Sequence, residues 1–272
     1  MLGLGAVISP KAQSRVKHGS LETQSNTGSY LSIPMTNSVF NSDHTISFWI
    51  KAQETDFSVM QMGYRHSSKD AASEYYIDLR ATTIAYVHTS RGKSVYTADF
   101  DLRKADNRAS KWYHIVCTQV SLSGTPQLAV YINGQIGANP VSSFRMDDKF
   151  RGIFSAASSF VFGGINISSD TNIDISNHQY KMRIANFSVW NVTMGSTAVS
   201  SLYNNGRGIK LHKSKGSYGQ SGNLVLNYNF NSPSQDGTYK STGSASNEVA
   251  TAVGCKHVAD HPFITKSERL QG

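Results

Sequence analysis

The sequence has no apolar run long enough to cross a membrane as a helix. Within its 272 residues no stretch approaches the ~18 consecutive apolar side chains that such a helix needs. Residues 2–8 are apolar, but no basic residue precedes them and no clear small-x-small cleavage motif follows. We therefore expect neither a membrane-spanning segment nor a secretion signal.

Cysteine is equally scarce, because the chain holds only Cys117 and Cys255, far apart in the sequence. Two isolated cysteines do not match the ligand spacing of a zinc site. Cys117 lies within an apolar stretch that reads as a core strand. We therefore expect it to be a small buried hydrophobic residue rather than half of a disulfide.

The sequence also lacks the patterns that mark hydrolytic enzymes. Neither Gly-x-Ser-x-Gly nor His-Glu-x-x-His occurs. A retaining glycosidase holds two carboxylates ~5–5.5 Å apart, whereas Glu74 and Asp78 would stand roughly 13 Å apart on one strand. His88, His114 and His178 have no evident partner in the sequence, so we interpret them as structural. The sequence therefore predicts a protein that is not an enzyme.

Acidic residues are outnumbered by basic ones, 18 against 26, which gives a formal net charge of +8. Such charge favours nucleic acid, acidic glycans or an acidic protein surface as a partner. No aromatic-rich nucleic-acid motif accompanies it, so we expect a solvated basic surface and no nucleic acid. The clustered basic residues are Lys11, Arg15 and Lys17; Arg103, Lys104, Arg108 and Lys111; and Arg207, Lys210, Lys213 and Lys215.

What the sequence does contain is a series of short β-strand patterns. The clearest is a hairpin in which residues 112–120 and 127–132 are apolar and β-branched and a loop of turn formers separates them. Asn133-Gly134 closes its second strand as a tight turn. Both faces of this hairpin carry apolar side chains, so we expect it inside a sandwich rather than at an edge.

Other segments predict further strands, a short helix and several loops. In segment 180–190, alternation puts Met182, Ile184 and Ser188 on one face and Phe187 and Val189 on the other. A helix is predicted over 197–203, with Asn204-Asn205-Gly206 as its C-cap. Polar loops are expected at 65–73 and 166–178, an exposed mobile loop at 207–222, and a turn-rich segment at 232–254. The remaining predicted strands are 29–34, 45–51, 57–62, 75–79, 83–89, 94–99, 158–162 and 223–230.

The chain shows neither an internal repeat nor a linker between two apolar halves. We therefore predict an all-β jelly-roll sandwich with one short helix. This domain spans residues 20–254, between an N-terminal arm at 1–19 and a C-terminal tail at 255–272.

Four segments, in order, resemble the laminin-G-like and concanavalin-A-like lectin/glucanase superfamily, which includes pentraxin-like domains. Residues 29–51 show a Tyr-containing strand that ends in Ile-Pro, followed by ISFWI; residues 112–134 form the central hairpin. Residues 180–206 resemble the closing strand, the short helix and its Leu-Tyr-Asn-Asn-Gly ending, and residues 223–230 the strand after it. The resemblance covers about residues 20–231 and implies a concanavalin-A-like jelly roll.

Some members of this superfamily bind calcium through acidic residues near the first strands and in the closing strand. The corresponding positions here are Ser25, Ser29 and Ala185. Hard cations prefer carboxylate ligands, so the resemblance implies that this calcium site is lost, and we predict no cofactor.

Sugar sites pair aromatic faces with carboxylates and amides, which suggests a set of candidate ligand-binding residues in the predicted loops. The same aspartates offer an alternative calcium site, although solvated surface residues would look the same. The candidates are Tyr64, Asp147, Asp148, Asp170, Asp174 and Tyr218.

The opening Met-Leu-Gly-Leu-Gly, followed by a laminin-G-like domain, resembles predicted structural proteins of marine bacteriophages. This resemblance implies a capsid decoration, head-fibre or tail-associated protein of the virion, assembled in the host cytoplasm. We expect capsid or tail proteins as partners, anchored through the arm or the tail, together with host surface glycans. Homo-oligomers are common among such spikes, so we expect one here as well.

Two alternatives stay open at this point. The first is a secreted or cell-surface adhesion lectin, for which glycans on the Asn-x-Ser/Thr sites at Asn166, Asn186 or Asn191 would be the sign. The second is a glycan-cleaving enzyme that uses unusual acids.

Overall fold

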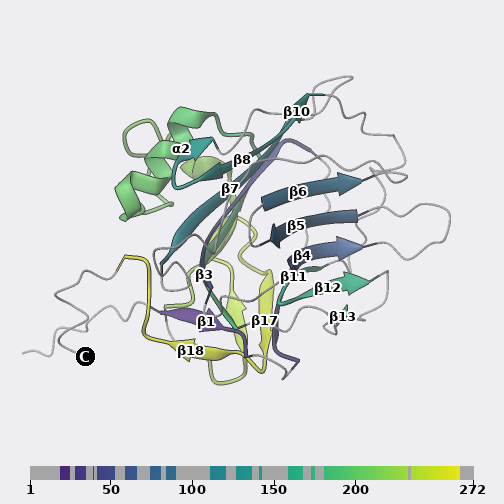
Figure 1. Ribbon diagram of the computed structural model, residues 1–272. Coiled ribbons are helices and arrows are strands. Elements are labelled where there is room, and N and C mark those ends of the chain that lie inside the picture. The colour runs from purple at the N-terminus through teal and green to yellow at the C-terminus, as the bar shows by residue number, and fades with distance from the viewer. Residues whose placement is uncertain are drawn as a thin grey trace, which may run out of the picture.

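The chain folds into two packed β-sheets and a short α-helix (Figure 1). The computed structural model describes residues 19–24, 28–34, 39, 42–52, 59–65, 74–80, 84–89, 111–120, 127–136, 141–142, 159–167, 173–174, 181–231 and 234–263. Only the backbone is described at 59–65, 74–76, 78–80, 84–89, 127, 141–142, 164–167 and 173–174. The predicted all-β sandwich with a short helix is confirmed. None of the described helices is long and apolar enough to cross a membrane.

Sheet A contains the predicted central hairpin and the closing strand. Its strands pair antiparallel throughout. Across the sheet the order is β10 (Val141–Ser142), β8 (Gln127–Ile132), β7 (Tyr113–Val120), β3 (His44–Ala52), β14 (Met182–Trp190), β1 (Ser20–Glu22) and β18 (Lys256–Val258), with β9 (Gln135–Ile136) beside β8 and β15 (Leu224–Tyr228) beside β14.

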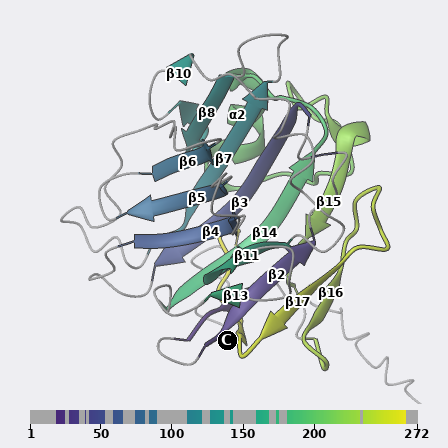
Figure 2. The same ribbon diagram turned by 90° about the vertical axis from the view of Figure 1, so that its right-hand side faces the viewer.

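Sheet B packs across sheet A, and Figure 2 shows its strands β11, β2 and β17 side by side. All its pairs are antiparallel except β12 with β4, which run parallel. The order is β13 (Ile173–Asp174), β12 (Gly164–Ile167), β4 (Val59–Arg65), β11 (Ser159–Phe162), β2 (Tyr30–Pro34), β17 (Val249–Val253) and β16 (Thr238–Lys240), with β5 (Glu74–Arg80) beside β4 and β6 (Ile84–Thr89) beside β5.

The main core lies between the two sheets. Phe187 of sheet A packs against Phe48 and Phe160, with ring centroids 6.3 Å and 5.5 Å apart. These rings are almost completely buried, and Cys117 lies in the same core as a free thiol, as predicted. Burying one such side chain contributes about 1.5–3 kcal/mol, so the hydrophobic effect is the principal force that holds the two sheets together.

A β-bulge interrupts β14 at Asn186. Ala185 pairs with Trp49 and Ser188 pairs with Ser47, so two residues of β14 oppose a single residue of β3. Asn186 has a φ of 49°, a left-handed conformation that asparagine adopts more readily than most residues. After the bulge, the side chains that point into the core are therefore those at odd-numbered positions instead of even-numbered ones.

The bulge changes which side chains of β14 face the core. Met182 and Ile184 before it, and Phe187 and Val189 after it, all lie in the core between the sheets. The prediction that Met182, Ile184 and Ser188 share one face is wrong, because strict alternation has no place for the extra residue.

A second, smaller core covers the outer face of β7 and β8. The helix α2 (Ser196–Tyr203) covers this core and buries Val199 and Leu202 in it. The helix ends at Asn204, a left-handed C-cap with a φ of 47°. Val116 of β7 and Tyr131 of β8 lie beneath it. The hairpin is apolar on both faces for this reason, as the sequence indicated.

The segment after α2 folds over the same core. It contains the short 3-10 helices η3 (Asn204–Gly206) and η4 (Ser221–Asn223). Tyr218 is fully buried in the second core, and Ile209 and Leu211 pack against it while half-buried. The expected exposed loop at 207–222 is confirmed in that the segment consists mostly of turns and many of its side chains are exposed, but Tyr218 is buried and anchors it. Its mobility stays a prediction.

The C-terminal part of the chain completes both sheets. β16 and β17 lie within the segment that we expected to be turn-rich, and β17 pairs with β2. β18 pairs with β1, so the tail predicted to begin at residue 255 is part of the sandwich as far as residue 263. Short strands without alternating hydrophobicity give too little signal for prediction from sequence.

Some predicted features lie outside the described residues or differ in detail. The expected loop at 166–178 contains β13 and the end of β12, which pair with each other. The arm at 1–19, apart from Gly19, and the predicted strand at 94–99 lie outside the described residues.

Candidate functional site

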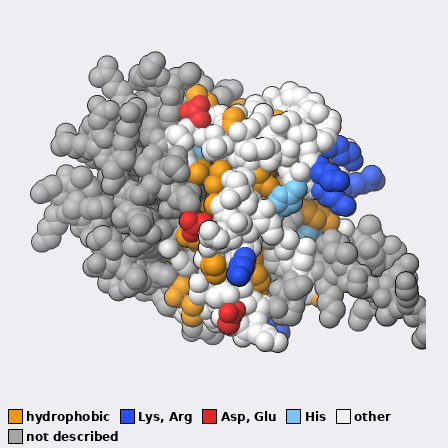
Figure 3. Space-filling model, turned by 180° about the vertical axis from the view of Figure 1, so that it is seen from behind, with side chains coloured by type: hydrophobic (Ala, Val, Ile, Leu, Met, Phe, Trp, Pro, Cys, Tyr) orange, Lys and Arg blue, Asp and Glu red, His pale blue; other side chains and the backbone are white. Residues whose placement is uncertain are grey.

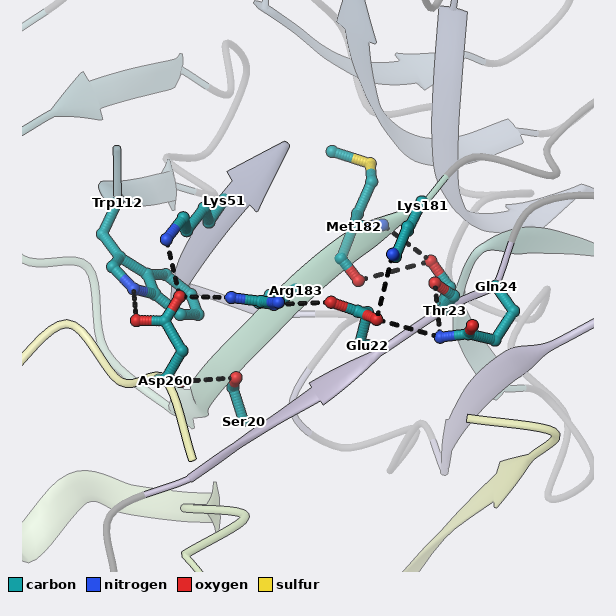
Figure 4. Close-up of polar contacts among 10 residues, drawn as sticks. All are labelled: Ser20, Glu22, Thr23, Gln24, Lys51, Trp112, Lys181, Met182, Arg183 and Asp260. Atoms are coloured by element: carbon teal, nitrogen blue, oxygen red, sulfur yellow. Dashed lines mark hydrogen bonds and ion pairs between the residues drawn. The ribbon is translucent and has the colours of Figure 1, made fainter. Parts of the chain in front are cut away.

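Charged side chains from four separate segments meet on the outer face of sheet A, the face that points away from sheet B. They are Lys51 at the end of β3, Arg183 of β14, Glu22 of β1 and Asp260, which follows β18 (Figure 4). We call this group the ionic cluster. Outward positions of strands β1, β3 and β14 supply three of its members, since the neighbouring residues point into the core.

Arg183 is the centre of the ionic cluster. Its Nε donates to Glu22 Oε2 over 2.6 Å, and its Nη1 donates to Asp260 Oδ2 over 2.5 Å. Lys51 Nζ donates to the same Asp260 oxygen over 2.6 Å. The guanidinium group therefore lies between the two carboxylates and binds both (Figure 4).

Neutral groups complete the hydrogen bonding of the two acids. The indole Nε1 of Trp112 donates to Asp260 Oδ1 over 3.3 Å, and Ser20 Oγ donates to the main-chain oxygen of Asp260 over 2.6 Å. Gln24 Nε2 donates to Glu22 Oε1 over 3.1 Å. Every carboxylate oxygen of the cluster thus has a donor, which is the condition under which buried charges are tolerated.

The pKa values of both acids lie below their ordinary values. Burial alone would raise the pKa of Glu22, but hydrogen bonds from Arg183 and Gln24 and the charges of Arg183 and Lys181 outweigh it. Burial likewise opposes ionisation of Asp260, and the hydrogen bond and charge of Lys51, with help from Arg183 and Trp112, hold its pKa low. Both groups are therefore carboxylates at neutral pH.

This protonation state decides what the ionic cluster can do chemically. Glycoside hydrolysis needs one carboxyl group that stays protonated and acts as a general acid. Glu22 and Asp260 are both ionised, and Arg183 fills the space between them. The ionic cluster is thus built to hold the C-terminal segment against sheet A and has no group that can act as the acid.

A row of aromatic rings lies beside the ionic cluster on the same face. The ring of Trp49 stacks on His114 with centroids 4.7 Å apart and on Tyr203 of α2 at 5.8 Å. Phe263 meets Trp49 edge-on at 5.3 Å. Trp49 is 4 % exposed and His114 2 %, so α2 and the C-terminal segment cover these rings.

His114 is a structural residue in this setting, as predicted. Its Nε2 lies 2.8 Å from Ser47 Oγ, while no described residue hydrogen-bonds its buried Nδ1. Burial lowers the pKa of His114 to about 3, so the ring is neutral at physiological pH.

Sequence reasoning missed the ionic cluster entirely. Its members are separated by long stretches of chain, and strand pairing alone brings them together. A usable signal existed in Lys51 and Arg183, which stand as isolated cations among apolar residues in HTISFWIKA and MRIANFSVW. A charge at an outward strand position indicates a partner on a neighbouring strand, although it does not identify that partner.

The structure rejects one of the candidate ligand-binding residues. Tyr218 was expected to be an exposed loop residue, but it has no exposed surface. Its hydroxyl accepts a hydrogen bond from Trp190 Nε1 over 3.0 Å and donates one to the Leu211 main-chain oxygen over 2.8 Å. Tyr218 therefore acts as an anchor of the second core.

The remaining candidates are placed only in part. The backbone of Tyr64 in β4 pairs with Asn166 of β12, and Asn166 pairs with Ile173 of β13, so Tyr64 and Asp174 lie two strands apart in sheet B. Asp147, Asp148 and Asp170 lie outside the described residues, as does Ser25. Their ligand-binding role stays a prediction.

The described residues offer no metal site. Within them, no three His, Cys, Asp or Glu side chains are grouped so that they could hold a metal ion. Ser29, one of the positions where calcium-binding relatives carry an acid, uses its hydroxyl to hold the backbone of Gln24, with Gln24 N 2.6 Å from Ser29 Oγ. Ala185, another such position, is completely buried opposite Trp49.

Solved structures of similar fold include a candidate carbohydrate-binding protein from Bacteroides ovatus. It is 14% identical, with a TM-score of 0.49, and the match covers 89% of this chain and 60% of that one. The binding domain of botulinum neurotoxin DC is 15% identical (TM-score 0.47; 68% and 42% covered), and a pentraxin from Limulus polyphemus is 13% identical (TM-score 0.39; 69% and 82% covered). The chain thus spans only about half the length of the first two. No curated protein matches it.

The family comparison covers most of the sandwich. Residues 25–200 match the family model of the concanavalin A-like lectin/glucanases superfamily. The matched region runs from just after β1 to the middle of α2, and it includes the central hairpin and all of β14. The chain therefore belongs to the concanavalin A-like lectin/glucanases superfamily.

Proposed function

We propose that this chain is a non-enzymatic structural protein of a virion, a capsid decoration, head-fibre or tail-associated protein whose sandwich binds host surface glycans. The observation that carries the non-enzymatic part is the Glu22–Arg183–Asp260 arrangement. Both carboxylates are ionised and bound to the same guanidinium group, so these two acids stabilise the fold.

The glycan-binding part is supported by the superfamily, which contains lectins as well as glucanases. Because one fold supports many functions, membership of the superfamily supports glycan binding but does not identify the glycan. The virion part is supported by the resemblance of the first residues to bacteriophage structural proteins. Its partners would be capsid or tail proteins, and its location the assembled particle.

Mass spectrometry of purified particles, with copies per particle counted, tests the virion part. Many stoichiometric copies are expected, and absence from particles would overturn it. A glycan array then tests the binding part, and incubation with the bound polysaccharide tests the absence of activity. Turnover that disappears on changing Glu22→Gln or Asp260→Asn, in protein that stays folded, would overturn the non-enzymatic part.

One observation favours the alternative of a secreted or cell-surface adhesion module. Asn191, in Asn191-Val192-Thr193, is exposed in the turn between β14 and α2, where a glycan could be attached. Intact-mass analysis of native material would show a glycan at Asn191 in that case. An unmodified Asn191 in material from a glycosylating host would count against this alternative.

A further inference from the structure

Four cations are displayed together on the segment that follows α2. Arg207, Lys210, Lys213 and Lys215 are all exposed, and we call residues 207–215 the basic loop. Figure 3 shows Lys and Arg side chains gathered at one side of the molecule, next to a His side chain. A cluster of like charges on one surface produces a potential that attracts anions.

The basic loop has no acidic counterpart nearby in the sequence. No Asp or Glu occurs between Asp174 and Asp236. Within the described part of the chain, none of the four cations forms an ion pair, in contrast to Lys51 and Arg183. Their charge is therefore available to a ligand.

The backbone of the basic loop is held in a defined shape. Lys215 and Tyr218 exchange two main-chain hydrogen bonds of 2.9 Å and 3.1 Å, and the buried Tyr218 hydroxyl binds the main-chain oxygen of Leu211. At the other end, Asn204 Nδ2 donates to the Gly208 main-chain oxygen over 2.8 Å. A fixed backbone lowers the entropy that is lost when several cations bind one ligand.

Hydrogen-bonding side chains lie within the basic loop and beside it. His212 Nε2 lies 3.2 Å from Thr242 Oγ1 and 3.3 Å from Asn227 Nδ2, and Asn227 Oδ1 accepts from Ser188 Oγ over 3.0 Å. His212 and Thr242 are exposed, whereas Asn227 is 7 % exposed. Imidazole, hydroxyl and amide groups of this kind can hydrogen-bond sugar hydroxyls.

We propose that the basic loop, which includes His212, forms with Thr242 a binding site for an anionic polysaccharide that carries sulfate or carboxylate groups. The proposal rests on the glycan-binding function proposed above and gives it a place and a ligand class. The lysines and Arg207 bind the acidic groups, while His212 and Thr242 bind hydroxyls of the same chain.

The same positive charge would also attract nucleic acid, but residues 207–215 contain no Phe, Tyr or Trp on which bases could stack. Single-stranded nucleic acid is held largely by stacking on aromatic rings. Tyr218, the aromatic residue of this segment, is completely buried, and Tyr203 faces Trp49 and His114. The described surroundings therefore favour a polysaccharide.

The test compares binding of dextran sulfate, polygalacturonate, neutral dextran and single-stranded DNA of similar length, measured by calorimetry on the full chain. The loop variant carries Lys210→Gln, Lys213→Gln and Lys215→Gln. The control variant carries Lys111→Gln, Lys240→Gln and Lys256→Gln, three lysines that are also exposed. Each variant lowers the formal net charge from +8 by three, to +5.

We expect one or both anionic polysaccharides to bind more tightly than neutral dextran and DNA. The loop variant should raise the Kd by about tenfold or more at about 50 mM salt, and the affinity of the wild type should fall steeply towards about 200 mM salt. The control variant should change the Kd by less than about threefold. Unchanged melting temperatures will show that both variants are folded.

Three results would overturn the inference. They are equal losses in the two variants, DNA binding as tight as polysaccharide binding, and no binding of either anionic polysaccharide. Binding of a neutral glycan that the loop variant retains would overturn this inference and leave the proposed glycan-binding function standing. The count of copies per particle is independent of either outcome.

Discussion

Arg183 of β14 donates a hydrogen bond to Asp260, 77 positions later in the chain, and this contact holds the C-terminal segment on sheet A. The side chains of Asp260 and Arg183 are each 19% exposed, and that of Lys51 is 10% exposed. Asp260→Ala would leave Lys51 without an acid, and Arg183 with Glu22 alone, in a largely buried site. We expect this change to lower the free energy of unfolding by about 3–5 kcal/mol, as measured by urea denaturation.

Lys181→Ala is the matched control for Asp260→Ala. Lys181 Nζ lies 3.7 Å from Glu22 Oε1, and its side chain is 41% exposed, so solvent screens the pair. We expect a change of about 0–1 kcal/mol. Equal effects of the two substitutions would show that the ionic cluster does not stabilise the fold.

Acid should destabilise the protein well before the carboxylates titrate. Burial lowers the pKa of His44 to about 4 and that of His114 to about 3, both from 6.5. The unfolded chain therefore binds more protons below about pH 6.5, and the stability held above that pH is lost as the pH falls towards the folded pKa values. Glu22 and Asp260, whose pKa values are also lowered, add their loss below about pH 4.5.

Denaturation at a series of pH values measures this dependence. Between about pH 7 and about pH 4.5 we expect a loss of about 2–3 kcal/mol for each histidine. The double variant His44→Asn/His114→Gln should make the curve flatter over this range, whatever its overall stability. A wild-type curve that is already flat there would contradict the buried, neutral state of both rings.

The Tyr218 hydroxyl joins Trp190 to the backbone of the basic loop. Tyr218→Phe keeps the buried ring and removes both hydrogen bonds, so we expect a loss of about 1–3 kcal/mol in thermal or urea unfolding. Tyr239→Phe is the control, since among the described residues the Tyr239 hydroxyl accepts only a long hydrogen bond of 3.4 Å from Ser234 N. If the basic loop binds anions as a fixed platform, Tyr218→Phe should also weaken dextran sulfate binding with every lysine in place.

The two thiols should be unreactive in the folded protein. Burial raises the pKa of the Cys117 thiol strongly and that of Cys255 to about 12, and Cys255 Sγ donates to the Tyr30 main-chain oxygen over 3.2 Å. The thiolate is the reactive form, so a thiol reagent at mildly alkaline pH should label neither residue quickly. In the unfolded protein the reagent should label both thiols quickly. Fast labelling of Cys117 in folded protein would contradict its place in the core.

Truncation separates the structural part of the C-terminus from any anchor. Removal of residues 256–272 deletes β18 and Asp260, so we expect a loss of stability at least as large as that of Asp260→Ala. Removal of residues 264–272 leaves every described contact in place and should change the melting temperature little. Attachment to particles should therefore be tested with the shorter deletion, since loss of attachment by the longer one could reflect unfolding.

The sequence was sufficient for the longer strands that carry an apolar stripe on at least one face. β3, β7, β8 and β15 lie within one residue of the predicted bounds at most ends, because each carries a continuous apolar stripe. The helix was found from its apolar residues and its Asn-Asn-Gly ending. Strands of two or three residues, such as β1 and β18, hold too few side chains to show a pattern.

The candidate site could not be predicted for a different reason. The order of strands across sheet A brings together the four members of the ionic cluster, Glu22, Lys51, Arg183 and Asp260. That order cannot be deduced from any short segment of the sequence. Tyr218 was misplaced because a single buried ring among Gly, Ser and Lys residues resembles an exposed loop residue. The composition of a segment indicates the average exposure of its residues, but it does not reveal that a single residue such as Tyr218 is buried.

The pairing of β1 with β18 has a consequence for how the protein is made. The hydroxyl of Ser20 binds the main-chain oxygen of Asp260, 240 positions later, so the first described strand lacks this partner until Asp260 has left the ribosome. Until then the outward acids and cations of sheet A have no complete set of partners. Final closure of the sheet must follow synthesis as far as Asp260, which favours slow folding.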